Sequence, residues 1–223
     1  MDSSAQATVP HCPHLVTQAA LECRSLFRSD RDRFVYLALA RQAARRFSWR
    51  LLGYSLLLER SQLIVSSAIP DNLDGGVRWM RRAFSSYLRT DRGDRRRLWQ
   101  SGYGLHALEG PMVWRALACI EIEPVRRGLS SNAESYLWSS AAAHLGVSRP
   151  YVPLDYTDWQ REFGIEVWRD YLDRCPGDIG YWRALQWASA SDFTPAGRGP
   201  RVCEIVGSQS EPAELQACLG FDG

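Results

Sequence analysis

Two residues of this chain could do covalent chemistry together, a thiol and a carboxylate that stand four positions apart: Cys119 and Glu123. Positions four apart lie on one face of an α-helix, so both side chains face the same side if the helix extends as far as Glu123. A thiolate is a nucleophile, but a soft sulfur without a metal or a neighbouring histidine is poorly suited to attacking a phosphodiester. The apolar residues Leu117, Ala118 and Ile120 around the thiol favour a buried packing role.

A second group with chemical potential lies near the start of the chain and consists of His11, Cys12 and His14. Imidazole and thiolate bind transition metals, but a metal site needs further ligands at a matching spacing, and none follow. The other cysteines are scattered without a CxxC pair, which is typical of free thiols. We interpret the cluster as a polar segment leading into a strand, and we predict no resident metal or cofactor.

The basic residues are concentrated, and all of them are arginine because the sequence contains no lysine. A guanidinium pairs well with phosphate, and a cluster of guanidinium groups attracts a polyanion such as DNA. The alternative interpretation is a set of solvated helix faces with no ligand. A smaller basic patch is formed by Arg41, Arg45 and Arg46. The residues predicted to contact DNA are Arg78, Arg81, Arg82, Arg89, Arg92, Arg95, Arg96 and Arg97, together with Arg126 and Arg127 after Pro124.

The net charge of +2 conceals an uneven distribution along the chain. Residues 1–129 contain 20 arginines and 12 acidic residues, whereas residues 130–223 contain 7 arginines and 13 acidic residues. The first part of the chain is therefore predicted to attract nucleic acid, and the second part is not.

The elements that would position these residues follow from apolar periodicity and from turn residues. The predicted order is strand, helix, strand, strand, helix, strand. This order indicates an α+β fold, a ferredoxin-like sandwich with an antiparallel sheet. Ser29 is predicted to cap the first helix. Strands are predicted at 14–20, 49–58, 62–68 and 98–108, helices at 30–47, 77–88 and 111–122, a turn at 70–76, a charged loop at 90–97 and a helix end at Pro124.

After residue 130 the sequence becomes helical and rich in tryptophan. Helices are predicted at 134–145, 157–163, 166–174 and 179–188. We predict that Trp49, Trp99 and Trp138 lie in the core, and that Trp159, Trp168, Trp182 and Trp187 pack between the C-terminal helices. The predicted organisation is a flexible N-terminus at 1–13, a main domain at 14–146, a helical C-terminal extension at 147–206 and a tail at 207–223.

Membrane and export signals are missing from the sequence. No run of about 18 apolar residues is present, so no membrane contact is predicted. The first residues lack the basic and apolar regions of a secretory signal, which favours the cytoplasm.

Several stretches of the sequence occur in an order and at a spacing that are typical of one family. They are LFRSDRDRFVYL at 26–37, FSWRLLGYSLLL at 47–58, RLWQSGY at 97–103 and, most specifically, IEIEPVRRGL at 120–129 followed by SYLWSSAAAHLG at 135–146. Together they resemble the REP-associated tyrosine transposases, single-tyrosine members of the HUH superfamily. The resemblance covers about residues 14–146, and the segment 159–206 is also similar to the family.

This resemblance implies the ferredoxin-like fold and a metal-dependent chemistry. In the family, a His-Xaa-His pair on a central strand binds Mg²⁺ or Mn²⁺, and a tyrosine on a later helix attacks the phosphodiester that the metal polarises. The product is a covalent link to the 5′ end of the DNA. The substrate that the family implies is single-stranded DNA with hairpins.

The sequence departs from the family at each catalytic position. Arg60 and Gln62 stand where the paired histidines are expected, and Cys119 stands in place of the tyrosine. Glu123 replaces a polar residue that assists the metal in relatives. Arginine stays protonated and offers no lone pair, so it cannot bind a divalent cation.

Three functions therefore remain open. The first is a transposase-like protein that binds single-stranded or hairpin DNA without cutting it, with a homodimer as one option. The second is an active enzyme with rebuilt chemistry at Cys119 and Glu123. The third is an interaction protein that binds no DNA. The sequence also leaves open whether Glu59, Glu121 and Glu123 gather into a carboxylate cluster, which would be a route back to metal binding.

Overall fold

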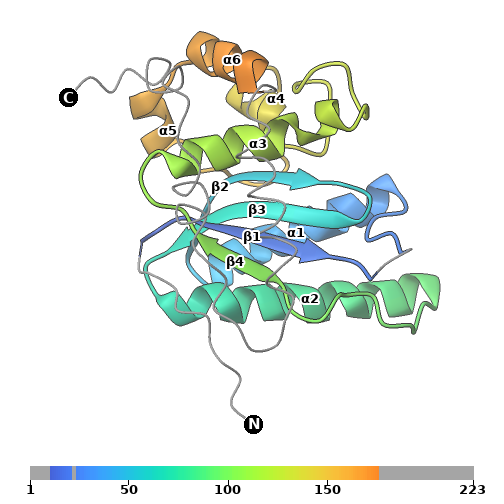
Figure 1. Cartoon of the computed structure of the whole chain (residues 1–223). Helices are drawn as coiled ribbons and strands as arrows, with labels where there is room; N and C mark the ends of the chain where they lie inside the picture. The colour runs from blue at the N-terminus through green and yellow to red at the C-terminus, as the bar shows by residue number, and fades with distance from the viewer. Residues whose placement is uncertain (1–10, 22–23, 176–223) are drawn as a thin grey trace.

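The computed structural model describes residues 11–21 and 24–175 (Figure 1). Within these ranges, the first six elements follow the order strand, helix, strand, strand, helix, strand, and further helices come after them. The strands are β1 (His14–Ala19), β2 (Trp49–Leu56), β3 (Arg60–Ser67) and β4 (Gly104–Ala107), and the helices are α1 (Asp30–Arg46), α2 (Pro70–Arg92), α3 (Met112–Arg126), α4 (Ala141–His144), α5 (Thr157–Glu162) and α6 (Ile165–Arg174).

The sheet has the strand order β2-β3-β1-β4, and every neighbouring pair is antiparallel. Helices α1 and α2 pack together on one face of the sheet, and α3 packs on the other face beneath α4, α5 and α6 (Figure 1). The predicted α+β fold with an antiparallel sheet is confirmed. The helices α5 and α6 confirm two of the predicted C-terminal helices to within a residue.

Helix α1 begins where the sequence predicts it, because Ser29 forms a reciprocal capping box with Asp32. The Ser29 hydroxyl accepts a hydrogen bond from the Asp32 backbone, and the Asp32 carboxylate accepts from the Ser29 backbone at 2.8 Å. These bonds satisfy N–H groups that have no partner inside the helix. Arg45 and Arg46 in the last turn complement the negative end of the helix dipole.

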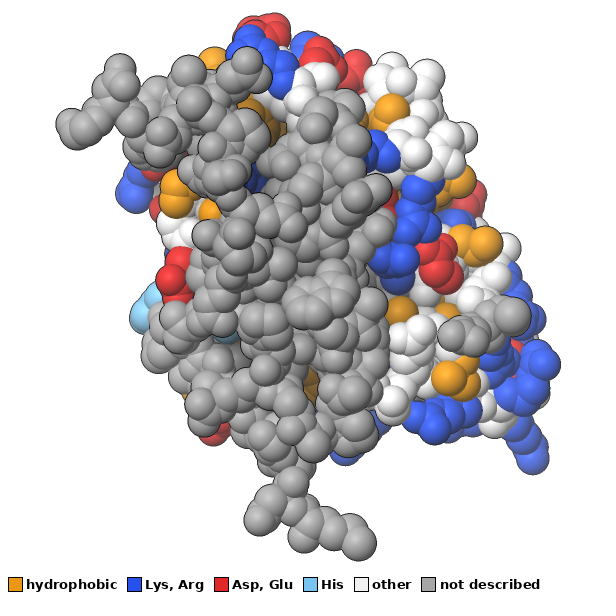
Figure 2. Space-filling view, viewed as in Figure 1, with side chains coloured by type: hydrophobic (Ala, Val, Ile, Leu, Met, Phe, Trp, Pro, Cys, Tyr) orange, Lys and Arg blue, Asp and Glu red, His pale blue; other side chains and the backbone are white. Residues whose placement is uncertain are grey.

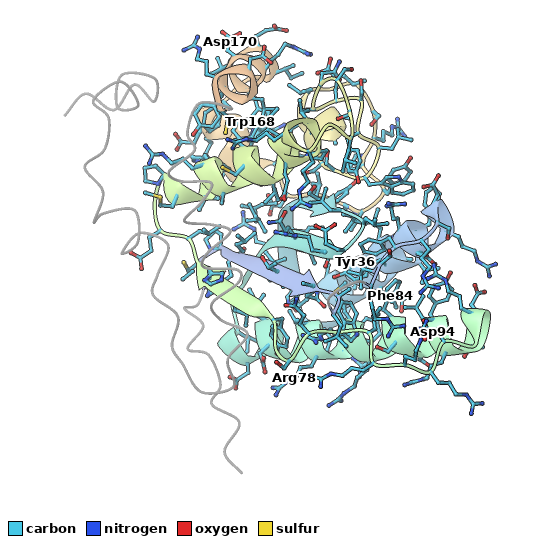
Figure 3. All side chains as sticks on the ribbon, turned by 45° about the vertical axis from the view of Figure 1, so that its right-hand side comes forward. Tyr36, Arg78, Phe84, Asp94, Trp168 and Asp170 are labelled. Atoms are coloured by element: carbon cyan, nitrogen blue, oxygen red, sulfur yellow. The ribbon has the colours of Figure 1, made fainter. Side chains whose placement is uncertain are left out.

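Strand β3 contributes side chains to two hydrophobic cores because alternate residues of a strand point to opposite faces of the sheet. Leu63 and Val65 belong to the core beneath α1 and α2, whereas Ile64 belongs to the core beneath α3. Tyr36 and Phe84 lie in the first core, between the sheet and its helices (Figure 3). The same alternation directs residues 60 and 62 toward the α3 face.

The outer edge of β2 is closed by the chain that follows α3. The Leu56 backbone N–H donates to the Trp138 carbonyl at 2.9 Å, and the Ser140 backbone N–H donates to the Tyr54 carbonyl at 3.0 Å. Because residues 138–140 are committed to this edge, the helix predicted at 134–145 is wrong apart from the single turn of α4. An edge strand with paired backbone groups is protected against pairing with another chain.

Gly53 of β2 lies against the side chain of Leu117 on α3. A Cβ atom at this position would collide with the side chain of Leu117 on α3 and would come within 2.9 Å of the Ser140 hydroxyl. The register between β2 and β3 also shifts between Leu51 and Gly53, which marks a bulge. Glycine therefore leaves room for the Leu117 side chain here, and a larger residue would force that side chain to shift.

The turn predicted at 70–76 is wrong, because α2 begins at Pro70 and continues to Arg92. Proline is tolerated in the first helical turn, where its missing N–H has no partner to lose. Gly76 serves packing, since a Cβ atom there would collide with the ring of Trp49. The helix ends at Gly93, whose φ of 63° is left-handed, so the predicted charged loop begins three residues later than expected.

Two more boundaries differ from prediction. The strand predicted at 98–108 is reduced to β4, because the Arg81 side chain binds the carbonyl oxygens of Gln100 and Gly102. Helix α3 does not end at Pro124 but continues to Arg126. Pro124 removes one helical hydrogen bond, while the Arg127 N–H still donates to the carbonyl of residue 123 at 3.0 Å.

The predicted burial of the tryptophans is confirmed wherever the structure describes them, for Trp49, Trp99, Trp138, Trp159 and Trp168. The predicted helix at 179–188 with its two tryptophans, residues 1–10 of the predicted N-terminus and the tail at 207–223 lie outside the described residues. In the described part of the chain, no helix has the length and apolarity needed to cross a bilayer.

Candidate functional site

The two positions that the resemblance assigns to a histidine pair lie on β3 and face α3. Arg60 begins the strand with 23% of its side chain exposed, and Gln62 is buried. Ile64, two residues further on, packs in the α3 core and fixes this orientation. The geometry expected for a pair of side chains on a central strand is therefore retained, although neither residue is histidine.

Cys119 and Glu123 both lie on α3 and are buried. The structure brings Glu123 toward Arg60, with their charged atoms 3.9 Å apart. Cys119, in contrast, is 1% exposed and belongs to the hydrophobic cluster that includes Leu117 and Ile120. Of the two candidate reactive groups, only the carboxylate joins the polar site.

Four side chains at the end of α3 and the start of β3 form what we call the closed network: Glu59, Arg60, Glu123 and Arg127. Arg127 binds Glu123 at 2.7 Å and Glu59 at 2.5 Å, and Arg60 lies 3.3 Å from Glu59. Two carboxylates thus face two guanidinium groups, so the charges balance within the group. The positive charge that the sequence suggests at this place is largely neutralised by its neighbours.

Burial and ion pairing act in opposite directions on these carboxylates. Burial raises the pKa of Glu123 above its usual value even though Arg60 and Arg127 oppose the change. For Glu59, burial alone would raise the pKa, but Arg127, a backbone hydrogen bond and Arg60 together lower it below its usual value. Glu123 is therefore the strained member of the closed network, and its ionised form depends on both arginines.

The metal ion that the resemblance implies does not fit these residues. Mg²⁺ and Mn²⁺ prefer anionic and neutral oxygen ligands. Arg60 supplies a cation, and Gln62 supplies one neutral oxygen, which has no hydrogen-bond partner among the described residues. The nearest carboxylates already bind guanidinium groups. Between residues 11 and 175, excluding 22 and 23, no group of three or more His, Cys, Asp or Glu could hold a metal ion.

The third glutamate does not join the closed network. Glu121 is fully buried on the opposite side of α3, where its carboxylate accepts from the Ser140 hydroxyl at 2.5 Å and from the Trp168 indole at 3.0 Å. It also lies 2.7 Å from His144 Nδ1. Trp168 lies between α6 and α3 (Figure 3). The question left open by the sequence is thus settled: Glu59 and Glu123 approach one another through Arg127, and Glu121 links α3 to the C-terminal helices.

The arginines between residues 78 and 97 divide into two kinds, and Arg81 shows the first. Its guanidinium donates to the backbone of Gln100 at 2.7 Å and to the backbone of Gly102, and it lies over the rings of Trp99 and Tyr103 at 4.9 and 5.2 Å. Burial lowers its pKa to about 10, so it stays protonated at neutral pH. Arg81 holds the chain after α2 in place and is not available to a ligand.

Arg92 is also tied into the protein. It forms an ion pair with Asp32, whose carboxylate is fully buried. Asp32 accepts from the Tyr87 hydroxyl at 3.1 Å as well. The ion pair between Arg92 and Asp32 therefore joins the end of α2 to the start of α1, and the two residues are 60 positions apart in the sequence.

The remaining arginines of this region are at the surface, some of them with acidic partners. Arg78 pairs with Asp74 one turn earlier and lies on the outer side of α2 (Figure 3), and Arg96 pairs with Asp94 at 3.2 Å. Four others are exposed and form no ion pair with any described residue. We call them the α2 arginine surface: Arg82, Arg89, Arg95 and Arg97.

The α2 arginine surface has a spacing suited to an extended polyanion. Arg82 and Arg89 are two helical turns apart on one face, which separates their Cα atoms by about 10 Å. Arginine side chains gather at the lower right of the face seen in Figure 2, at the end of the molecule where α2 ends in Figure 1. The other predicted contacts differ: Arg126 is partly buried at the end of α3, and Arg127 belongs to the closed network.

Two of the three arginines of the smaller basic patch line a groove that the sequence did not reveal, whereas Arg46 lies over the rings of Phe47 and Trp79. Arg41 and Arg45 on α1 share a groove of about 540 Å³ with Phe34 and Tyr151. Phe34 has the helical spacing of a core residue, yet 48% of it is exposed. The spacing of Phe34, Ala38, Arg41 and Arg45 on one helix face was the available signal, whereas nothing in the sequence indicated Tyr151.

Comparisons with known proteins agree with the fold. No family model matches the sequence, and no curated protein matches it. A solved structure, that of a REP-associated tyrosine transposase bound to a REP hairpin, is similar with a TM-score of 0.53 and 16% sequence identity. The match covers 71% of this chain and 94% of that chain. A likeness at this identity establishes a shared fold and a distant structural resemblance.

Proposed function

From this shared fold, we propose that the chain is a degenerate relative of the REP-associated tyrosine transposases that binds DNA and does not cut it. The observation that carries the proposal is the α2 arginine surface, four exposed arginines without an acidic partner among the described residues. Such side chains bind phosphate with little desolvation and without first breaking an internal ion pair.

The inability to cut is supported by the state of each catalytic position. Attack on a phosphodiester in this family needs a metal and an activated hydroxyl nucleophile. Here Arg60 and Gln62 do not form a metal site, and Cys119 packs among apolar residues. The closed network fills the same region with balanced charges. Binding does not require any of these lost groups, because it depends on phosphate contacts elsewhere.

The proposed ligand is single-stranded or hairpin DNA. The structurally similar transposase was solved with a REP hairpin bound, and the sequence resemblance implies the same class of substrate. Arginines that contact phosphates set the position of a nucleic acid but carry no base specificity. We therefore expect affinity for hairpins of different sequence to be similar at this surface, and a homodimer stays a prediction.

The test is a gel assay of labelled hairpin and single-stranded DNA with the purified protein, with and without Mn²⁺, on native and denaturing gels. We expect a shift on the native gel and intact DNA on the denaturing gel. The Arg82→Glu/Arg89→Glu variant should bind roughly tenfold or more weakly, with the slope of log affinity against log salt reduced by about 2.

A matched control is the Arg161→Glu/Arg174→Glu variant, which makes the same change in charge at exposed positions of α5 and α6. It should keep most of the affinity. Absence of salt-dependent binding would overturn the proposal in favour of an interaction protein. A nick, or a covalent protein–DNA band that Cys119→Ser abolishes, would instead establish an active enzyme with a rebuilt site.

A further inference from the structure

Helix α1 carries a groove with an aromatic end and a cationic end. The aromatic end is made by Phe34 and Tyr151, which are 48% and 45% exposed. The cationic end is made by Arg41 and Arg45, about two and three turns beyond Phe34 on the same helix face. Leu37 is buried and forms the floor between them. The groove lies on α1, apart from the α2 arginine surface and on the other side of the sheet from the closed network.

The aromatic end is rigid because its rings support one another. Phe34 meets Trp138 edge-on at 4.9 Å and Tyr151 edge-on at 5.2 Å, and Tyr151 stacks on Trp138 at 5.7 Å with an angle of 20° between the rings. Trp138 is buried and is held by its backbone to the edge of β2. An exposed ring fixed in this way offers a stacking surface without a large loss of side-chain freedom on binding.

The cationic end is available to a ligand. Arg41 and Arg45 are exposed and form no ion pair with any residue that the structure describes. The groove has no acidic residue in its lining. A partner that suits both ends must carry flat apolar rings and negative charges within about 10 to 16 Å of one another, the distance that separates Phe34 from Arg41 and Arg45 along the helix.

We propose that this groove binds an unpaired segment of DNA, with a base stacked on the ring of Tyr151 beside Phe34 and the adjoining phosphates on Arg41 and Arg45. Every base offers a flat ring, and single-stranded DNA combines such rings with a phosphate at each step. The choice of DNA as the occupant rests on the proposed function. The groove adds a second contact, which distinguishes a hairpin with an unpaired extension from a hairpin without one.

The experiment compares two labelled probes, a hairpin with a blunt stem and the same hairpin with an unpaired extension that contains 2-aminopurine. Fluorescence anisotropy gives the affinity, and quenching of 2-aminopurine reports stacking. The wild-type protein should bind the extended probe roughly tenfold more tightly and quench its fluorescence. The Arg41→Glu/Arg45→Glu variant should lose this difference and bind the blunt probe nearly as the wild type does.

Two further variants separate stacking from folding. Tyr151→Phe keeps the ring and should keep the quenching, whereas Tyr151→Ala should reduce the quenching, with circular dichroism confirming that both are folded. The Arg161→Glu/Arg174→Glu control should retain the preference for the extended probe. Equal affinity of the wild type for both probes, or an unchanged preference in the groove variants, overturns this inference alone. Failure to bind either probe overturns the proposed function together with it.

Discussion

At the scale of single residues, the closed network shows which side chains occupy the place where the resemblance implies a metal ion. Arg60 stands where a metal ligand is expected and carries the positive charge itself. Glu123 and Glu59 balance that charge and the charge of Arg127. A guanidinium cannot act as a Lewis acid toward a phosphodiester, although it can neutralise one. Because these charges balance, we expect this region to bind phosphate weakly in the native protein.

The first residue-scale prediction follows from Glu123, which is fully buried and whose pKa is raised by burial. A carboxyl group with a raised pKa stabilises the fold below its unfolded pKa, and this contribution is lost as the pH rises through the folded value. The Glu123→Gln variant has no carboxyl group to ionise here, so it does not lose this stability as the pH rises. The substitution also leaves one net positive charge in the closed network. We expect the unfolding free energy of the variant to exceed that of the wild type by an amount that grows from about pH 4.5 to the raised pKa of Glu123 and is constant above it, and DNA affinity at pH 7 to rise roughly threefold.

Urea denaturation across this pH range and fluorescence anisotropy with a hairpin measure both effects. Glu162→Gln, at an exposed position on α5, makes the same change of charge and should alter neither quantity appreciably. A fall in DNA affinity on removing Glu123 would contradict the neutralising role of the carboxylate.

The arginine surface shows how far residue-level prediction reaches. A cluster of arginines between 78 and 97 is visible in the sequence. The residues that bind some of these arginines within the protein, and so make them unavailable to a ligand, cannot be identified from the sequence. Asp32 reaches Arg92 from the first helix, and the carbonyl groups that hold Arg81 become available only because the chain after α2 folds back. Which arginines remain free is therefore decided by tertiary contacts, and spacing alone cannot separate Arg81 from Arg82.

At the scale of elements, Asp32 provides a buried polar link between α1 and α2. Its carboxylate accepts from two backbone N–H groups at the start of α1, from the Tyr87 hydroxyl, and from Arg92 near the end of α2. Asp32→Asn should lower the unfolding free energy by about 3 kcal/mol, because it leaves the guanidinium without its partner. Ser29→Ala, which removes only the cap, should cost about 1 kcal/mol. Chemical denaturation of both variants checks the order, and equal losses would refute the proposed link.

The elements were predicted best where local signals agree. The capping box of α1 and the alternating strands are local features, so their positions follow from the sequence. The element boundaries were predicted wrongly where a residue that typically marks a turn or a helix end instead makes a tertiary contact. Gly76 was interpreted as a turn residue but makes room for Trp49, and Pro124 was expected to end a helix that tertiary packing maintains. The segment at 134–145 has helical periodicity, yet its backbone pairs with the edge of β2.

At the scale of the whole molecule, the C-terminal helices share a core with α3. Trp168 and Leu172 of α6 and Trp159 of α5 are buried in the same cluster as Leu117 and Ile120. The boundary at residue 146 that the sequence suggests passes through this cluster and beside the bond between Glu121 and Trp168. The division into a main domain and an extension stays a prediction. We expect the unit that folds cooperatively to extend beyond residue 146 and to include α5 and α6.

A chain ending at Gly146 should accordingly lack a cooperative thermal transition. Loss of Trp168 alone removes burial worth on the order of 5 kcal/mol, which is comparable with the stability of a typical domain. Differential scanning calorimetry checks this expectation. A chain ending at Cys175 keeps the contacts between α3 and the C-terminal helices and should retain the transition. The shared core would be contradicted if both truncated chains lost the transition, or if the shorter chain unfolded cooperatively.

Gly53 has a consequence for tracing the ancestry of proteins of this kind. Its lack of a side chain leaves room for Leu117 of α3 against the sheet, and this packing role is independent of any reaction. Selection on catalysis ends when activity is lost, and the metal-binding and nucleophilic positions are then free to drift. A steric requirement persists for as long as the protein folds. If the proposed function holds, we expect inactive relatives of these transposases to keep a small residue at this contact after the catalytic signature has disappeared.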